Sequence, residues 1–170
     1  MVTDWLADID AHVDIVRHLA VLLVAYVLAL PIAWDRERNE RSAGLRTFPL
    51  VAIAACGFIQ AAETVTKENA EATARIVEGI INGLGFIGGG AILVGKASIR
   101  GTATAASLWA TGAIGAAVGL GAYETAVVLS IVTFVTLRVM TNFKVEPREP
   151  EPDGEAEDGQ HDGRRFKDSK

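Results

Sequence analysis

Long apolar runs separated by short charged clusters dominate this chain. Five such runs are evident, at residues 19–34, 47–62, 76–94, 101–123 and 125–140. A helix that crosses a bilayer needs about 20 mainly apolar residues, and flanking charged side chains extend a shorter run by reaching toward the interface. The pattern therefore predicts an all-α fold, a polytopic membrane helix bundle with about five transmembrane helices.

The charged residues divide the chain into three parts. We expect an acidic extracytoplasmic N-terminus at residues 1–14, a transmembrane domain at residues 15–142 and an acidic cytoplasmic tail at residues 143–170. The tail is rich in proline and acids and cannot bury enough apolar surface to fold, so we expect it to be disordered. Lysine and arginine are more frequent at residues 35–46, 96–100 and 138–170 than in the other connections, which places these segments in the cytoplasm and the N-terminus outside.

Two internal connections carry most of the remaining charge. Residues 35–46 contain four arginines and three acids, and two interpretations stay open: a solvated loop, or a charged boundary that meets ions or a partner. In the second interpretation we expect Asp35 to pair with Arg46. Residues 63–75 are expected to form a polar connector.

Glycines concentrate in residues 78–95. The segment Gly83-Leu-Gly85-Phe-Ile-Gly88 fits the spacing of a dinucleotide-binding loop, but no acid follows between Glu78 and Glu124 to bind a ribose. Glycines four residues apart instead make a flat helix face that a neighbouring helix can approach closely in lipid. We expect the helices at 76–94 and 101–123 to pack against each other through two such faces, with contact to a transmembrane helix of a partner as the alternative. Their residues are Gly79, Gly83, Gly85 and Gly89 on the first helix, and Gly112, Gly115, Ala116 and Gly119 on the second.

A few polar residues lie within these two runs. Asn82 is expected to hydrogen-bond across helices, although a functional polar site is the alternative. Thr104, Ser107 and Thr111 recur on one face of the later run, which is so poor in leucine and isoleucine that we expect it to be buried among other helices.

The composition argues against several classes of function. The net charge of −5 is not the basic balance of a nucleic-acid-binding protein, and the single cysteine cannot form an intrachain disulfide. The three histidines are far apart, and no triad or paired carboxylate is evident, so we expect neither an enzyme nor a bound cofactor.

Four motifs in a fixed order resemble the MgtC/SapB family of bacterial inner-membrane proteins. They are Trp34-Asp-Arg-Glu-Arg38 with Ala43-Gly-Leu-Arg-Thr47, Asn82-Gly-Leu-Gly-Phe-Ile-Gly-Gly-Gly90, Ser98-Ile-Arg-Gly-Thr-Ala-Thr-Ala-Ala-Ser-Leu-Trp109, and Gly112-Ala-Ile-Gly with Gly119-Leu-Gly-Ala-Tyr123. The resemblance covers about residues 19–140. It departs at Asp35, where the family has Glu, and at Asn82, where the family has a small hydroxyl residue.

The resemblance implies a role in adaptation to low magnesium. It implies a multi-pass protein of the bacterial inner membrane, in a family associated with virulence, that regulates a membrane protein partner such as a transporter or the ATP synthase. A magnesium transporter or channel component is the alternative, with Mg²⁺ as a transported or sensed ion, and a homo-oligomer stays open. Many members carry a folded C-terminal domain, and we expect only the acidic tail in that place here.

Acids at the boundaries of the predicted spans, Asp35, Glu37 and Glu78, are the candidate metal ligands, and the motifs assign further candidate functional positions to this chain. The other motif residues are Arg36, Gly44, Leu45, Arg46, Asn82, Gly83, Gly85, Gly88, Arg100, Gly101, Thr104 and Trp109.

Overall fold

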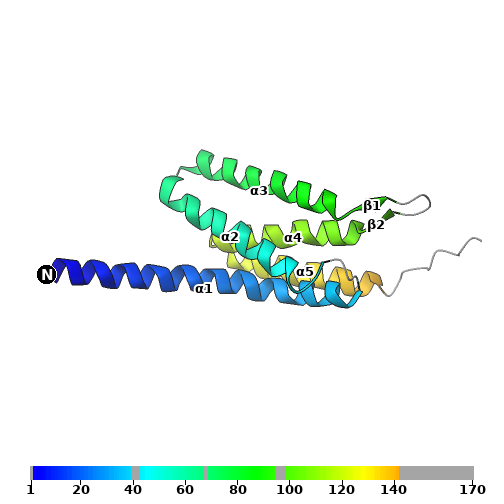
Figure 1. The fold of residues 1–170 in the computed structure, drawn as a ribbon, viewed down its shortest axis with the longest axis horizontal. Helices are drawn as coiled ribbons and strands as arrows, with labels where there is room; N and C mark the ends of the chain where they lie inside the picture. The colour runs from blue at the N-terminus through cyan, green and yellow to red at the C-terminus, as the bar shows by residue number, and fades with distance from the viewer. Residues whose placement is uncertain (1, 40–42, 67–68, 95–98, 142–170) are drawn as a thin grey trace, which may run out of the picture.

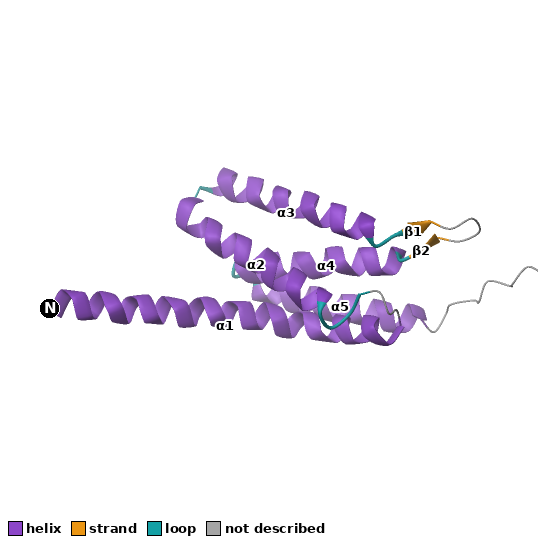
Figure 2. Cartoon of the chain, in the orientation of Figure 1, coloured by secondary structure: helices purple, strands orange, loops and turns teal. Residues whose placement is uncertain are grey.

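The computed structural model describes residues 2–39, 43–66, 69–94 and 99–141 as a bundle of five helices (Figure 1). The helices are α1 (Val2–Asn39), α2 (Thr47–Thr66), α3 (Ala70–Gly90), α4 (Thr102–Gly119) and α5 (Tyr123–Thr141). A short antiparallel hairpin, β1 (Leu93–Val94) and β2 (Ile99–Arg100), connects α3 to α4 (Figure 2). The all-helical prediction is confirmed for these residues, and the predicted tail at 143–170 lies outside them.

The first helix is longer than the apolar run that predicted it. The first helix includes nearly all of the acidic segment 1–14 and continues through Pro31 to Asn39, so residues 35–39 are helical and not part of a loop. Arginine and glutamate are good helix formers, and Arg36 and Arg38 in the last turn face the negative end of the helix dipole.

The connector predicted at 63–75 is also shorter than expected. Helix α2 continues to Thr66, and α3 begins at Ala70 after Asn69, whose side-chain oxygen accepts a hydrogen bond from the backbone N–H of Ala72 at 3.1 Å. At its other end α3 stops at Gly90, before the end of the apolar run, because the chain turns into the hairpin.

Helix α4 is the centre of the bundle and packs against each of the other four helices. Its buried residues include Leu108, Ile114 and Val118 together with many small side chains. The expectation that this weakly hydrophobic helix would be buried is confirmed, because small residues let several neighbouring backbones approach at once.

The glycines of α4 lie at close helix contacts. A Cβ on Gly115 would meet the backbone carbonyl of Ala52 in α2, and one on Gly119 would lie 2.8 Å from Cβ of Ile59. A Cβ on Gly112 would meet the side chain of Leu84 from α3. The neighbouring Ala116 is buried as well.

The expected glycine face of α3 does not pack inside the bundle. A Cβ added at Gly79, Gly83, Gly85 or Gly89 would have no neighbouring atom within 4 Å. Leu84 and Gly88 make the contact with α4 instead, and Gly88 lies against Ala105. The predicted pairing of two glycine faces is therefore wrong within this chain, since α3 turns a different side toward α4.

Much of the outer surface is apolar. Large hydrophobic side chains are exposed on every helix, and Phe86 of α3 is 86% exposed. Two helical segments, Val13–Asn39 and Tyr123–Met140, are long and apolar enough to cross a membrane, and Thr47–Glu63 is a shorter apolar helix. About five membrane crossings stay a prediction.

Candidate functional site

A buried charged cluster joins α1, α4 and α5 near the C-terminal end of α1. Asp35 and Arg36 are only 1% and 3% exposed although they are consecutive charged residues. Oδ1 of Asp35 lies 3.5 Å from Nη1 of Arg138 in α5, and Nη2 of Arg36 donates to Oγ1 of Thr104 in α4 at 3.3 Å. Burying a charge is costly unless it is paired, so these contacts compensate part of the cost.

The contacts of Asp35 compensate only part of the cost of burying its charge. Its side chain is fully buried, whereas the Arg138 side chain is 55% exposed, and the 3.5 Å separation is long for an ion pair. Oδ2 of Asp35 has no hydrogen-bond partner among the described residues. The exposed Arg138 is therefore the cation that faces the buried carboxylate of Asp35, whereas Arg36 contacts Thr104 of α4.

The threonine and serine residues of α4 complete this polar region. Ser107 donates its hydroxyl hydrogen to the carbonyl of Thr104 at 3.0 Å, and Thr111 donates to the carbonyl of Ser107 at 2.8 Å. Both side chains satisfy their hydrogen-bonding groups inside one helix, so α4 buries them at low cost.

Glu37 and Gly44 form a second, exposed contact beside the cluster. The backbone N–H of Leu45 donates to Oε2 of Glu37 at 3.0 Å. A Cβ on Gly44 would collide with the Glu37 carboxylate. Gly44 is therefore the residue that lets the end of α1 hold the loop that leads into α2.

The predicted pair between Asp35 and Arg46 does not form. Asp35 contacts Arg138, whereas Arg46 is exposed at the start of α2 beside α3. From the sequence alone, Arg138 counts only among the basic residues that place the segment 138–170 in the cytoplasm. Its position in the last turn of an apolar helix was the available signal, but the partner lies 103 residues away in the sequence.

The outward face of α3 carries a second set of predicted residues. Glu78, Asn82, Gly85 and Gly89 recur at helical spacing, and all four are exposed. The hydrogen bonds of the described residues do not include one from Asn82 to another helix, so the expected contact of Asn82 is not made within the chain. Gly83 instead faces α2 and lines a cavity there.

The remaining motif residues surround the hairpin and the start of α4. Gly101 has a φ of 86°, and a Cβ there would collide with the carbonyl of Ala91, so glycine is required at this turn. Arg100 is exposed in β2, and Trp109 is half-exposed on α4.

The candidate metal ligands do not converge. Asp35 is buried beside Arg138, Glu37 is exposed next to Leu45, and Glu78 lies on the outer face of α3. No group of three or more His, Cys, Asp or Glu side chains that could hold a metal ion occurs within the described ranges.

Comparison with known proteins decides the family. Residues 22–145 match the MgtC family, a range that includes the charged cluster, the hairpin and four of the helices in full. The chain belongs to the MgtC family. The resemblance of the four motifs is thereby confirmed, and the MgtC family is one of membrane proteins, which agrees with the two apolar helices.

Three relatives illustrate the range of the MgtC family. Protein SrpB of Synechococcus elongatus is 36% identical over 135 residues, which cover 72% of each chain. Protein MgtC of Salmonella typhimurium is 38% identical over 111 residues, or 65% of this chain and 47% of the relative. The putative magnesium transporter YhiD of Escherichia coli is 33% identical over 124 residues, which cover 69% of this chain and 58% of the relative.

The matched region is only part of some relatives. The chain spans about half the length of the Salmonella protein and 53% of the uncharacterized protein slr0014 of Synechocystis. No solved structure matches the chain.

Proposed function

We propose that this chain is a multi-pass protein of the bacterial inner membrane that supports adaptation to low magnesium as a non-enzymatic regulator. It acts by binding another membrane protein through helix contacts. The N-terminus lies outside and the C-terminal tail in the cytoplasm, as the distribution of lysine and arginine indicates. Membership of the MgtC family and the name of the putative magnesium transporter YhiD support the connection with magnesium.

The outward face of α3 is the observation that carries this proposal. Helices in lipid associate through small residues, and polar side chains such as Asn82 add hydrogen bonds between them. In this chain Gly85 and Gly89 are open, and Glu78 and Asn82 are exposed beside them. A polar, glycine-rich face directed at lipid is unfavourable until another helix covers it, so we infer that this face binds the partner.

The charged cluster supports regulation over ion binding. Mg²⁺ binds to carboxylates and retained waters, whereas Asp35 lies beside the guanidinium of Arg138, and Arg36 is the next residue in the chain. The positive charge of the arginines repels a divalent cation. The cluster instead connects α1, α4 and α5 and thereby fixes the bundle that presents α3.

Substitution of Gly85 tests the proposal. Gly85→Leu places a large side chain on the outer face without a clash inside the chain, whereas Gly85→Ala keeps the face small. We expect Gly85→Leu to fold, to lose cross-linking to the partner in native membranes and to fail to support growth in low magnesium, while Gly85→Ala behaves as the wild type. Normal growth and cross-linking of a folded Gly85→Leu protein would overturn the proposal.

A magnesium transporter or channel component is the alternative. It is favoured by the name of the YhiD relative and by the exposed Glu78, since an oligomer formed through α3 would bring several such carboxylates together. Uptake of ²⁸Mg into proteoliposomes that contain only this protein, lost in Glu78→Gln, would select the alternative over regulation. Absence of uptake by correctly oriented, folded protein would reject it.

A further inference from the structure

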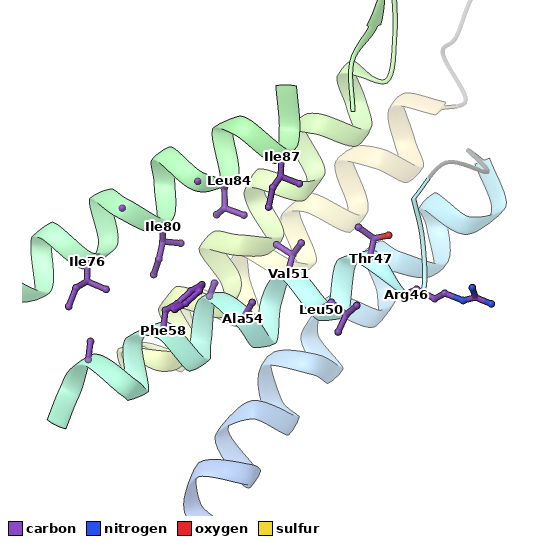
Figure 3. Close-up of a pocket in the computed structure, with 14 residues that line it drawn as sticks. Arg46, Thr47, Leu50, Val51, Ala54, Phe58, Ile76, Ile80, Leu84 and Ile87 are labelled. Atoms are coloured by element: carbon purple, nitrogen blue, oxygen red, sulfur yellow. The ribbon is translucent and has the colours of Figure 1, made fainter. Parts of the chain in front are cut away.

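A long apolar groove lies between α2 and α3 on the side of α3 opposite the outward face. It encloses about 790 Å³, and Figure 3 shows its walls running along both helices. The large apolar side chains that line it include Leu50, Val51, Phe58, Ile76, Ile80 and Ile87. Small residues, including Ala54 and Gly83, line it between them and leave the space open.

The two ends of the groove differ in charge. Arg46 lines one end, where its exposed side chain extends away from the apolar part (Figure 3). The ion pairs among the described residues do not include Arg46. The far end is lined by Ala62, and the adjacent Glu63 is exposed. An anionic group is therefore attracted more strongly to the Arg46 end than to the far end, where the cation Arg75 pairs with Glu71 and the acid Glu63 is exposed.

We propose that this groove binds one anionic phospholipid, with an acyl chain along α2 and α3 and the phosphate at Arg46. Basic side chains at the edge of a site between membrane helices are the groups that select anionic headgroups. The proposal rests on the membrane placement of the chain and not on its regulatory role. Arg46 is the specificity-determining residue, and Ile80, Phe58 and their neighbours contact the hydrocarbon.

The dimensions favour an acyl chain over a partner helix. The α2 wall from Thr47 to Ala62 is about 22 Å long at ~1.5 Å per residue. This exceeds the ~15 Å of one leaflet, half of a hydrocarbon core of ~30 Å, so one acyl chain fits along it. A membrane-spanning helix is about 30 Å long, which is longer than this wall, and about 10 Å wide, so it matches the groove less well than an acyl chain does.

Native mass spectrometry of the full-length protein in detergent provides the test. The protein is titrated with phosphatidylglycerol, and separately with zwitterionic phosphatidylcholine of the same acyl chains. We expect preferential binding of one phosphatidylglycerol, reduced about fivefold in Arg46→Gln, the effect of losing about 1 kcal/mol for one basic side chain. Arg75→Gln is the matched control, because Arg75 lies near the opposite end and pairs with Glu71 at 2.8 Å.

A second pair of variants tests the position of the acyl chain. Gly83→Leu fills the groove, whereas Gly85→Leu adds the same side chain to the outer face of the same helix, and neither meets an atom within 4 Å at Cβ. We expect Gly83→Leu to lose at least tenfold in phosphatidylglycerol binding and Gly85→Leu to bind as the wild type. If Gly83→Leu does not fold, Ala54→Leu blocks the opposite wall of the groove.

Several outcomes would overturn the proposal. They are equal binding of the two lipids, unchanged binding by Arg46→Gln, and unchanged binding by a folded groove-filling variant. Cross-linking of Gly83→Cys in native membranes to a second copy or to another protein would assign the groove to a helix instead. Loss of partner contact in Gly85→Leu with normal lipid binding would separate the regulatory proposal from this one.

Discussion

Two helices of this molecule have similar glycine spacing and use it in opposite ways. Gly112, Gly115 and Gly119 of α4 lie against side chains or backbone of neighbouring helices, whereas Gly85 and Gly89 of α3 face open space. Glycine spacing therefore identifies a helix surface that another helix can approach closely, but it does not show whether that helix belongs to the same chain. In this protein α4 builds the fold, and α3 is left with a surface for binding.

The sharpest test of this contrast is Gly115→Leu, for which we expect the largest effect. Its Cβ would collide with the carbonyl of Ala52, so the α2 backbone must move. Overpacking typically costs up to about 3 kcal/mol, and we expect this upper value here because backbone and not a flexible side chain must move. We expect the apparent melting temperature in detergent to fall by roughly 6–12 °C, or the folded peak in size-exclusion chromatography to disappear. A melting temperature like that of the wild type would show that α2 and α4 are not in close contact.

The buried cluster predicts the next largest effect. Arg138→Gln removes the cation that faces Asp35 and leaves a buried carboxylate, which destabilises the protein by about 2 kcal/mol. The expected fall in melting temperature is roughly 4–8 °C. Asp35→Asn in the same protein should restore part of the loss, because the neutral amide no longer needs a counter-charge. If the fall in melting temperature of the double variant equals the sum of the falls of the two single variants, the pairing of these two residues is contradicted.

The contact between Glu37 and Gly44 predicts a smaller effect. Gly44→Ala displaces the Glu37 carboxylate and removes its hydrogen bond from Leu45, at a cost of about 1 kcal/mol, or roughly 2–4 °C. In a Glu37→Ala background the same substitution should cost almost nothing. Thermal unfolding of the two single variants and the double variant measures the coupling, and a full loss in both backgrounds would mean that Glu37 is not the obstacle.

The order of the helices could be predicted from the sequence because each helix corresponds to an apolar run, which is visible in the local sequence. The runs at 47–62 and 125–140 both lie within single helices, α2 and α5. The end of α1 was mispredicted because charges suggested a loop, while helix propensity and burial of Asp35 kept the chain helical. Local composition shows that a residue is charged but not that a distant residue will cover it.

The candidate site was predicted only in part for the same reason. The motifs included Asp35, Arg36 and Thr104, which the structure brings into one region, but the partner of Asp35 was assigned to the nearby Arg46. The choice of Arg138 depends on how α5 packs against α1, which no short-range pattern contains. Likewise, helical spacing placed Gly79, Gly83, Gly85 and Gly89 together, although only the first two line the groove against α2.

The smallest expected effect completes the contrast with α4. Gly85→Leu should change the melting temperature of the isolated protein by less than about 2 °C, since a surface substitution without new contacts alters stability by under ~0.5 kcal/mol. It carries the same glycine-to-leucine change as Gly115→Leu, so any difference between them comes from what surrounds each position. A large fall for Gly85→Leu in a monodisperse monomer would place that glycine inside the fold. A fall only in a sample that contains dimers would instead identify the second copy as the helix that covers α3.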